Sequence, residues 1–486
     1  MKRLFQFLLT AALLIFSFPP FDLGFLAYLA FVPFFFALEN ISLKKTAWLS
    51  TLTGYCFFLG LIHWLHHVTW PGTLFLIFYL SLYFTLFGVG LKLIDKRWCI
   101  FVAPFFWVVL EFLRTHLLTG FGWALLGYSQ WRALGLIQFA DTTGVYGVSF
   151  LVMATNATLY ELLRKRGRRT VRIFSVLFLN LFLFFSWGYG KTVLSRTFPD
   201  TFRATVIQGN IPQDLKWDIS VQDLIMTKYE RLTEVAAQEK TDAVFWPETA
   251  VPGFLPDDDA LLERLAALNR KTKTYLLAGS PWSEKELTYN SALLLYRGEI
   301  LQRYDKLHLV PYGEFIPLEE QFPMLRDWIV TGDFYPGKEA TIFKHPKGTF
   351  SVLVCFEDIF PDLVRRFASK ADFLVNITND AWFGKSASPF QHAQASVFRA
   401  IENRRSVLRV TNTGYTCLID PAGRILQDLE LGGEKLFVTG FRTWEVPLSK
   451  TTTFYLRFGD LFAWVCHGIT LLSFSVFLFL NALKKK

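Results

Sequence analysis

Eight long apolar runs constrain this chain more than any other feature of its sequence. Seven lie before residue 192, at roughly 4–20, 22–38, 47–67, 72–94, 99–118, 145–163 and 173–191, and the eighth spans about 460–483. Runs of about 18 or more apolar residues have the length that an α-helix needs to cross a bilayer. The sequence therefore predicts a polytopic α-helical membrane protein with a long soluble insertion before its last helix.

Two of these runs have alternative interpretations. The first could be a signal peptide, but Phe18, Pro19 and Pro20 offer no small-residue cleavage site and a second apolar run follows at once, so we expect a retained helix. The run at 22–38 is short and could instead be a re-entrant or interfacial helix. The composition agrees with a membrane protein, because 52% of the residues are hydrophobic and only 19% are charged.

The distribution of basic residues predicts how the helices are oriented, because short cytoplasmic loops collect Lys and Arg. With the N-terminus in the cytoplasm, sixteen Lys and Arg fall in cytoplasmic segments, whereas the connections near 18–22 and 67–72 carry none and the one at 119–144 carries only Arg132. We therefore expect both termini in the cytoplasm and residues 192–455 in the periplasm. The sixteen are Lys2, Arg3, Lys44, Lys45, Lys92, Lys96, Arg97, Arg164, Lys165, Arg166, Arg168, Arg169, Arg172, Lys484, Lys485 and Lys486.

This topology also accounts for the net charge of +9, because the rest of the chain is slightly acidic. A nucleic-acid-binding protein would carry a basic face on its soluble part, so we expect no nucleic-acid binding. The five cysteines form no CxxC pair and no metal-ligand spacing, which argues against a disulfide framework and a metal site. His63, His66 and His67, near a span end, are expected to be interfacial residues and not metal ligands.

Residues 200–447 change character, because short β-rich segments alternate there with amphipathic stretches. This alternation predicts an α/β or layered α+β domain of about 250 residues, with its chemistry where strands end and loops begin. The amphipathic stretches are 222–238 and 258–270. The expected strands are 203–210, 242–248, 274–280, 291–296, 350–355, 372–378, 406–412 and 416–421.

Three of these strand ends carry reactive side chains. Glu248 follows an apolar run directly beyond Trp246 and Pro247, where partial loss of water would make it a usable base. Lys306 lies among apolar and aromatic neighbours and could stabilise an oxyanion. Cys355 ends the apolar run 351–354 before an acidic turn, as a nucleophile elbow does.

Each of these residues also has an ordinary interpretation. A Glu at a strand end is often a helix cap or an ion-pair partner, and Lys306 could pair on the surface with Asp305 or Glu314. Buried free cysteines are mostly inert core residues. The three together, in this order and each at a strand end, are more specific than any one of them.

This combination resembles the nitrilase superfamily, whose members use a Glu-Lys-Cys triad in a four-layer α-β-β-α sandwich. The segments around the three residues read WPE, YDKLHLVPYGE and VLVCFED. Further stretches that match are 208–210 (QGN), 376–384 (NITNDAWFG), and 399–405 (RAIENRR) before 411–414 (TNTG). The apolar runs and this resemblance together predict a polytopic α-helical membrane domain joined to an α/β nitrilase-like α-β-β-α sandwich.

A nitrilase-like domain between a seventh and an eighth membrane helix resembles the apolipoprotein N-acyltransferase family of the bacterial inner membrane. The family resemblance implies a phospholipid acyl donor, a diacylglyceryl-modified apolipoprotein as acceptor, contact with membrane lipids, and neither cofactor nor metal. It also implies an acyltransferase that completes lipoprotein maturation through a Cys thioester. The expected domains are 1–192 with seven transmembrane helices, 200–447 as the periplasmic catalytic domain, and 458–486 as the last helix with a basic cytoplasmic tail.

The resemblance also assigns roles by position. Glu248 matches the general base, Lys306 the oxyanion lysine and Cys355 the nucleophile, while Glu314 and Glu357 match further glutamates of the site. Phe356 stands where the family is associated with Tyr, but the backbone N–H that could bind an oxyanion remains. The other residues expected at the active site or in loops above it are Trp217, Asn290, Trp382 and Phe383, with Trp328 and 315–317 as further lid candidates.

Two other functions fit parts of the sequence. A membrane-tethered nitrilase or amidase hydrolase would use the same triad with water as the acceptor, although eight spans are many for a tether. A transporter or scaffold with an inactive sandwich would need ionisable residues inside its spans, and few are present apart from Glu111 and Arg114.

Overall fold

The computed structural model describes residues 1–94, 99–164, 169–317, 319–321, 323–327 and 333–485. They form two compact units. A helical unit comprises Met1–Arg196, Ser386–Glu402 and Thr453–Lys486, and a sheet unit comprises Thr197–Lys385 and Asn403–Thr452. The segment Ser386–Glu402, which the sequence places inside the soluble domain, therefore belongs with the membrane helices.

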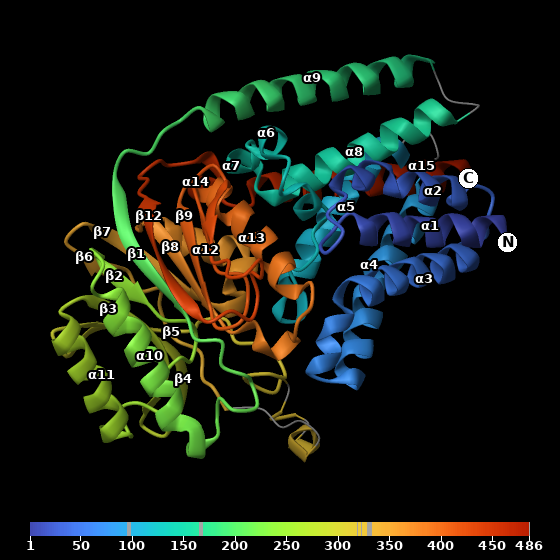
Figure 1. Cartoon of the computed structure of the whole chain (residues 1–486). Coiled ribbons are helices and arrows are strands. Elements are labelled where there is room, and N and C mark those ends of the chain that lie inside the picture. The colour runs from blue at the N-terminus through green and yellow to red at the C-terminus, as the bar shows by residue number, and fades with distance from the viewer. Residues whose placement is uncertain (95–98, 165–168, 318, 322, 328–332, 486) are drawn as a thin grey trace. The chain divides into compact units, whose positions relative to one another are not determined.

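In the helical unit, each of the eight predicted apolar runs forms a helix (Figure 1). Five helical segments in the described part of the chain are long and apolar enough to cross a membrane: Leu43–His67, Trp70–Leu93, Ile100–Thr119, Arg169–Leu194 and Leu461–Leu480. The eight helices are α1 (Lys2–Phe16), α2 (Ala27–Leu38), α3 (Leu43–Ile62), α4 (Trp70–Leu93), α5 (Cys99–His116), α8 (Val145–Leu163), α9 (Arg169–Leu194) and α15 (Leu461–Lys485).

Two of these helices carry apolar residues that the protein itself does not cover. In the most apolar stretch of α9 only 11% of the residues are buried, and in that of α15 only 17%. A helix that is apolar all round and exposed requires an apolar solvent, which a bilayer supplies. By contrast, α2 has only 12 residues and contains Pro33, so its crossing of the membrane stays a prediction.

The unit also contains α13 (Ser388–Asn403) and three short helices, α6 (Leu134–Ile137), α7 (Ala140–Thr143) and α14 (Phe454–Phe458). Gln391 joins α13 to the membrane segments. Its side-chain oxygen accepts from the indole N–H groups of Trp64, at 3.1 Å, and Trp123, at 2.9 Å. Its amide nitrogen donates to the carbonyl oxygens of Pro19 and Leu61, both at 3.0 Å. One side chain thus binds three separate stretches of the chain.

The two ionisable residues near the end of α5 support a loop. The carboxylate of Glu111 accepts from the backbone N–H of Leu126 at 2.6 Å, and Arg114 donates to the carbonyl oxygens of Trp123, at 2.6 Å, and Ala124, at 3.2 Å. Both side chains are therefore engaged in holding residues 123–126, which is a structural role and not that of an ion pathway.

The sheet unit consists of two six-stranded sheets, in the orders β12-β1-β2-β3-β4-β5 and β11-β10-β9-β8-β7-β6. Strands β1 to β3 pair in parallel in the first sheet, as do β7 to β9 in the second. The strands are β1 (Thr201–Gln208), β2 (Ala243–Phe245), β3 (Tyr275–Glu284), β4 (Leu287–Tyr296), β5 (Glu299–Asp305), β6 (Phe343–His345), β7 (Gly348–Val354), β8 (Phe373–Thr378), β9 (Ser406–Thr411), β10 (Cys417–Ile419), β11 (Ile425–Asp428) and β12 (Gly440–Pro447).

Aromatic side chains join the inner faces of the two sheets. Phe202 and Phe245 of the first sheet contact Phe350 and Phe373 of the second, with ring centroids 5.1–6.4 Å apart. Helices α10 (Gln222–Ala236) and α11 (Asp259–Thr272) pack on the outer face of the first sheet (Figure 1), and α12 (Pro361–Ala368) contacts β7 and β8. The predicted layered sandwich is confirmed.

All eight predicted strands and both predicted helices are present, but four strands were not predicted: β5, β6, β11 and β12. Each of them lies at or next to the edge of its sheet. Edge strands face water on more sides and therefore carry polar residues that blur the apolar pattern. In β8, by contrast, all six residues are buried, and four of them, Phe373, Leu374, Val375 and Ile377, give the apolar signal of a central parallel strand.

Candidate active site

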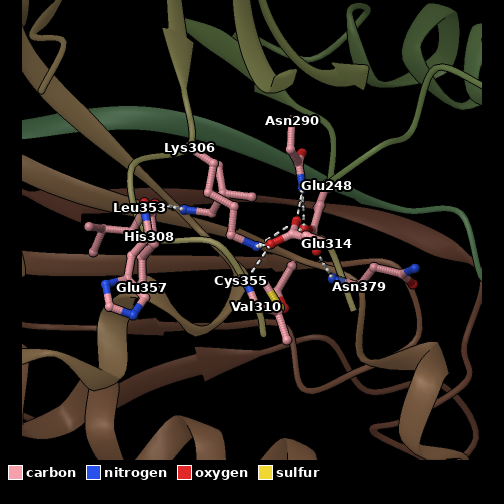
Figure 2. Close-up of polar contacts among 12 residues, drawn as sticks. Glu248, Asn290, Lys306, His308, Val310, Glu314, Leu353, Cys355, Glu357 and Asn379 are labelled. Atoms are coloured by element: carbon pink, nitrogen blue, oxygen red, sulfur yellow. Dashed lines mark hydrogen bonds and ion pairs between the residues drawn. The ribbon is translucent and has the colours of Figure 1, made fainter. Parts of the chain in front are cut away.

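Three strand ends from the two sheets converge on one place in the sheet unit. Glu248 follows β2, Lys306 directly follows β5, and Cys355 directly follows β7. Figure 2 shows the side chains of Glu248, Lys306 and Glu314 pointing toward one another beside Cys355. The Nζ atom of Lys306 lies 3.6 Å from Oε1 of Glu248. The structure therefore brings the three predicted residues together, although 107 positions separate the first from the last.

The buried carboxylate of Glu248 is fixed at both oxygens. The side-chain amide of Asn290 donates to Oε1 at 2.8 Å, and the backbone N–H of Asn379 donates to Oε2 at 2.8 Å. Beneath it, Gly279 of β3 leaves no room for a side chain, because a Cβ there would lie 2.4 Å from the carbonyl oxygen of Pro247. Glu248 is thus held with little freedom to turn away from the site.

Lys306 is buried, with only 1% of its side chain exposed, between two carboxylates. Its ammonium lies 2.9 Å from each oxygen of Glu314, which also accepts from the backbone N–H of Val310 at 2.8 Å. Burial alone lowers the pKa of Lys306, but the carboxylates of Glu314 and Glu248 outweigh it, so the pKa is raised above its ordinary value. Lys306 is therefore a permanent cation in this site.

Cys355 has a left-handed backbone conformation, with φ of +55°, which is rare for a residue that is not glycine. The side-chain amide of Asn376 donates to its carbonyl oxygen at 2.8 Å and thereby supports this turn. Arg409 in turn donates to the side-chain oxygen of Asn376 at 3.0 Å and forms a buried ion pair with Asp358 at 3.0 Å. A strained turn of this kind is the geometry of a nucleophile elbow.

The residue Cys355 as a whole is partly exposed to solvent. Burial of its surroundings, followed by the negative charge of Glu248, raises the pKa of Cys355 well above its usual range, while Lys306 lowers it. The resting thiol is therefore protonated at neutral pH. A nucleophilic thiolate at this position requires a base that takes the proton during the reaction.

Glu357 connects the turn at Cys355 with the segment that carries Lys306. Its carboxylate accepts from the backbone N–H groups of Val354, Leu307 and His308 at 2.7–3.0 Å and from the hydroxyl of Tyr304 at 2.8 Å. Burial is the main cause that raises the pKa of Glu357 to about 7. Because it touches both segments and lies behind the site, Glu357 fits a supporting role.

The remaining predicted residues fall into two groups. Asn290 and Phe356 lie in the site: Asn290 bonds both Glu248 and Glu314 at 2.8 Å, and the ring of Phe356 lies 5.5 Å from Nζ of Lys306. Trp217 and Trp382 lie on the surface, with exposed fractions of 44% and 45%. Phe383 and the segment 315–317 are partly buried or buried, and Trp328 lies outside the described residues.

Two residues of the site were not singled out from the sequence. Asn379 holds Glu248 through its backbone N–H, and a backbone group leaves no signature in the residue type. Lys216 is buried beside Glu248, and its Nζ donates to the carbonyl oxygen of Glu248 at 2.9 Å. A lysine in a polar loop normally points to solvent, so there was no reason from the sequence to expect Lys216 in the site. Its only link to the site was its position next to Trp217, which the resemblance had assigned there.

Comparison with known proteins gives concordant results for both parts of the chain. Residues 10–158 match the family model of the apolipoprotein N-acyltransferase N-terminal domain, and residues 203–442 match that of carbon-nitrogen hydrolase. An apolipoprotein N-acyltransferase from Geobacter metallireducens is 39% identical, over 94% of this chain and 92% of its own length. One from Chlorobaculum tepidum is 30% identical, over 96% of this chain and 95% of its own length.

Among solved structures, an amidase of the nitrilase superfamily from Nesterenkonia is 19% identical over 54% of this chain and 96% of its own chain, with a TM-score of 0.40. The sequence relatives cover nearly the whole chain, including both the membrane helices and the sheet unit. On this evidence, the chain belongs to the apolipoprotein N-acyltransferase family.

Proposed function

We propose that Cys355, Glu248 and Lys306 transfer an acyl group from a membrane phospholipid to the N-terminal amine of an apolipoprotein through a thioester. The observation that carries this proposal is the buried cluster of two carboxylates and one lysine beside the strained turn of Cys355. It supplies a nucleophile, a base and a fixed cation at one point. The acceptor is proposed to be the amine of a diacylglyceryl-modified N-terminal cysteine.

In the first half-reaction Glu248 takes the proton of Cys355, and the thiolate attacks the ester carbonyl of the phospholipid. Lys306 and the backbone N–H of Phe356 face the oxyanion that develops, and each well-placed donor of this kind contributes about 3–4 kcal/mol to catalysis. When the carbon–oxygen bond breaks, the lysophospholipid leaves with the proton that Glu248 returns. Cys355 then carries the acyl group as a thioester.

In the second half-reaction the amine of the apolipoprotein attacks the thioester, and Glu248 accepts the proton that the amine loses. The same donors stabilise the second oxyanion. When the carbon–sulfur bond breaks, the Cys355 thiolate takes the proton back from Glu248 and the product leaves as an amide. Glu248 thus ends the cycle as it began, which a general base requires.

A nitrilase-type hydrolase that uses water as acceptor is the alternative, and it is not favoured, because relatives that match 94% and 96% of this chain are named apolipoprotein N-acyltransferases. The burial of Lys306, Glu248 and Glu314 supports a site that excludes water, which would protect the thioester. The two functions differ in their product: the acyltransferase releases an amide, and the hydrolase releases a free fatty acid.

We further propose that the sheet unit faces the periplasm of a bacterial inner membrane and that both termini face the cytoplasm. The support is the distribution of Lys and Arg between alternate loops. Six of the residues that carry this argument lie outside the described residues: Lys96, Arg97, Lys165, Arg166, Arg168 and Lys486.

Mass spectrometry of the intact purified protein after incubation with phospholipid vesicles tests the reaction class. We expect a mass increase of one acyl chain on Cys355 that hydroxylamine removes, and its loss on addition of a diacylglyceryl-cysteine peptide with formation of the N-acyl peptide. Release of free fatty acid without amide would establish the hydrolase instead. Absence of any adduct while amide still forms would replace the thioester by direct attack of the amine.

A further inference from the structure

Lys216 is a second buried lysine beside Glu248 that the proposed reaction does not use. It lies in the loop between β1 and α10, and only 4% of its surface is exposed. Its Nζ donates to the carbonyl oxygen of Glu248 at 2.9 Å. Within the part of the chain that the structure describes, no carboxylate oxygen lies within 4.0 Å of this ammonium. Among the described residues, Lys216 is therefore a buried cation without an ion-pair partner.

Such an arrangement is costly, because burial removes the hydration of an ammonium group and only a nearby negative charge compensates for it. Burial lowers the pKa of Lys216 to about 8, while Glu248 and Cys355 act in the opposite direction. The two groups that favour its charged form are thus the base and the nucleophile of the proposed reaction. A lysine that served only to support the loop would be more stable with its ammonium in solvent.

The loop that carries Lys216 is fixed on the same elements as the site. The side chain of Gln213 accepts from the side-chain amide of Asn379 at 2.8 Å, and Asn412 bonds both the carbonyl oxygen and the N–H of Ile211, at 2.7 and 2.9 Å. Asn379 is also the residue whose backbone N–H holds Glu248. Lys216 and Glu248 are thereby positioned by one shared set of hydrogen bonds.

The charge balance of the site explains why a second cation is useful. Glu248 and Glu314 share a single lysine, Lys306, so this group of three carries one net negative charge when all are ionised. A thiolate or a tetrahedral oxyanion adds a further negative charge in a region of low dielectric, where like charges repel strongly. One additional positive charge next to Glu248 offsets the excess.

We propose that Lys216 is a positioning residue of the acyl-transfer reaction: it fastens the peptide group of Glu248 and supplies the second positive charge that the anionic site requires. This inference rests on the proposed function, because it assigns Glu248 as the base. It goes beyond the triad, since Lys216 acts through Glu248 and the local field and not on the substrate. Three observations together carry it: the contact with Glu248, the burial of Lys216, and the lack of an ion-pair partner among the residues that the structure describes.

Its test compares three variants of the full-length protein in detergent and lipid: Lys216→Met, which keeps the size but not the charge, Lys216→Arg, which keeps the charge, and Lys271→Met as control. Lys271 is an exposed lysine of α11 that pairs with Glu234, so its loss removes one charge of the same unit far from the shared hydrogen bonds of the site. Two quantities are measured for each: the rate of thioester formation from phospholipid vesicles, and the rates of Cys355 alkylation by iodoacetate and by iodoacetamide.

We expect Lys216→Met to slow thioester formation about 10–100-fold, in the range of a displaced acid–base group, through kcat more than through KM. The ratio of alkylation by anionic iodoacetate to that by neutral iodoacetamide should fall in Lys216→Met. Lys216→Arg should keep this ratio and recover most of the rate, and Lys271→Met should match the unchanged protein. Equal rate losses in the Met and Arg variants with an unchanged ratio would reduce Lys216 to a structural residue and overturn the inference.

A pH titration of the unchanged protein tests the same inference and does not depend on whether Lys216→Met folds. The iodoacetate-to-iodoacetamide ratio should decrease as pH rises through about 8, where Lys216 loses its charge, and Lys216→Arg should abolish that decrease. Glu357, with its pKa of about 7, contributes an earlier decrease that both proteins share, whereas Lys306 stays charged. Glu248 and Asp380 also face Cys355. A ratio that stays constant from pH 7.5 to 9 would contradict the inference.

These outcomes are distinct from those that test the proposed function. If the unchanged protein forms no acyl adduct on Cys355, the thioester mechanism fails. If the adduct forms at the same rate in the unchanged protein and in folded Lys216→Met, only the role of Lys216 fails.

Discussion

The backbone N–H of Asn379 donates to Oε2 of Glu248 at 2.8 Å and thereby joins the ends of two strands that belong to different sheets. Glu248 follows β2 in the first sheet, and Asn379 follows β8 in the second. The carboxylate of the proposed base is thus oriented by the packing of the two sheets. Any change that shifts one sheet against the other also moves Glu248 relative to Cys355, which lies on the second sheet.

The first prediction concerns the nucleophile. Cys355→Ala should give neither a hydroxylamine-sensitive adduct nor acylated lipoprotein, because Cys355 is the cysteine beside Glu248 and Lys306, whereas burial raises the pKa of Cys417 to about 12. A protein in which Cys56, Cys99, Cys417 and Cys466 are all alanine should still load, with some loss of stability. Intact-mass measurements after incubation with phospholipid follow both. Acyl transfer by Cys355→Ala would exclude a thioester on this residue.

The second prediction concerns the base. Glu248→Gln preserves the shape and can still accept from Asn379, but it cannot take a proton from Cys355. Loss of a positioned acid–base group costs about 10²–10⁴ in rate, so thioester formation should fall by that factor while the protein remains folded in the membrane. Glu263→Gln on the exposed face of α11 is the matched control. Loading of Glu248→Gln at the normal rate would remove Glu248 from the mechanism.

The third prediction concerns the cation. Lys306→Met leaves Glu314 and Glu248 without the ammonium that pairs with both, and it removes the proposed donor for the oxyanion. Thioester formation should decrease about 10²–10³-fold, the cost of one oxyanion donor. The double change Lys306→Met with Glu314→Gln removes one of the two buried carboxylates that lose their ammonium, and should recover part of the stability but not activity. Recovery of activity in the double variant would show that Lys306 has only a structural role.

The fourth prediction is a pH dependence of stability. Burial raises the pKa of Glu357 from 4.5 to about 7, so its protonated form is favoured in the folded state. Stability from this group is fully present below pH 4.5 and is lost as pH rises toward and through 7, which amounts to about 3 kcal/mol at 1.36 kcal/mol per unit. Glu357→Gln, which does not titrate, should unfold at a lower temperature but with a flatter pH profile between 5 and 8. If the unfolding temperatures of the two proteins changed with pH in the same way, the raised pKa assigned to Glu357 would be disproved.

The fifth prediction concerns Gln391. Gln391→Leu leaves two indole N–H groups and two carbonyl oxygens of the helical unit without their partner, and each unpaired buried group costs about 1–3 kcal/mol. Thermal unfolding in detergent should shift downward by several degrees. Gln394→Leu is the control on the same helix, because its Nε2 makes no hydrogen bond to any residue that the structure describes. Equal shifts in the two variants would show that the four hydrogen bonds of Gln391 contribute little.

The sequence by itself determined the elements that strong periodic signals encode. The membrane helices follow from apolar runs that no soluble surface tolerates, and the central strands follow from continuous burial, as in β8. The positions of Glu248, Lys306 and Cys355 at strand ends were also readable, since a strand boundary is a local property. Edge strands such as β12, whose polar residues face water, could not be predicted from the sequence.

Only the tertiary structure decided which side chains meet. The contact between Glu248 and Asn379 spans 131 positions and uses a backbone N–H, so no pattern of residue types predicts it. Lys216 looks like an ordinary loop lysine until the fold buries it against Glu248. Gln391 lies in the stretch assigned to the soluble domain, yet the structure places it among the membrane segments, 268 positions from one of its partners. The physical reason is common to all three: local sequence sets backbone propensity and burial pattern, whereas partners of buried polar groups depend on which distant segments the packing brings within hydrogen-bond distance.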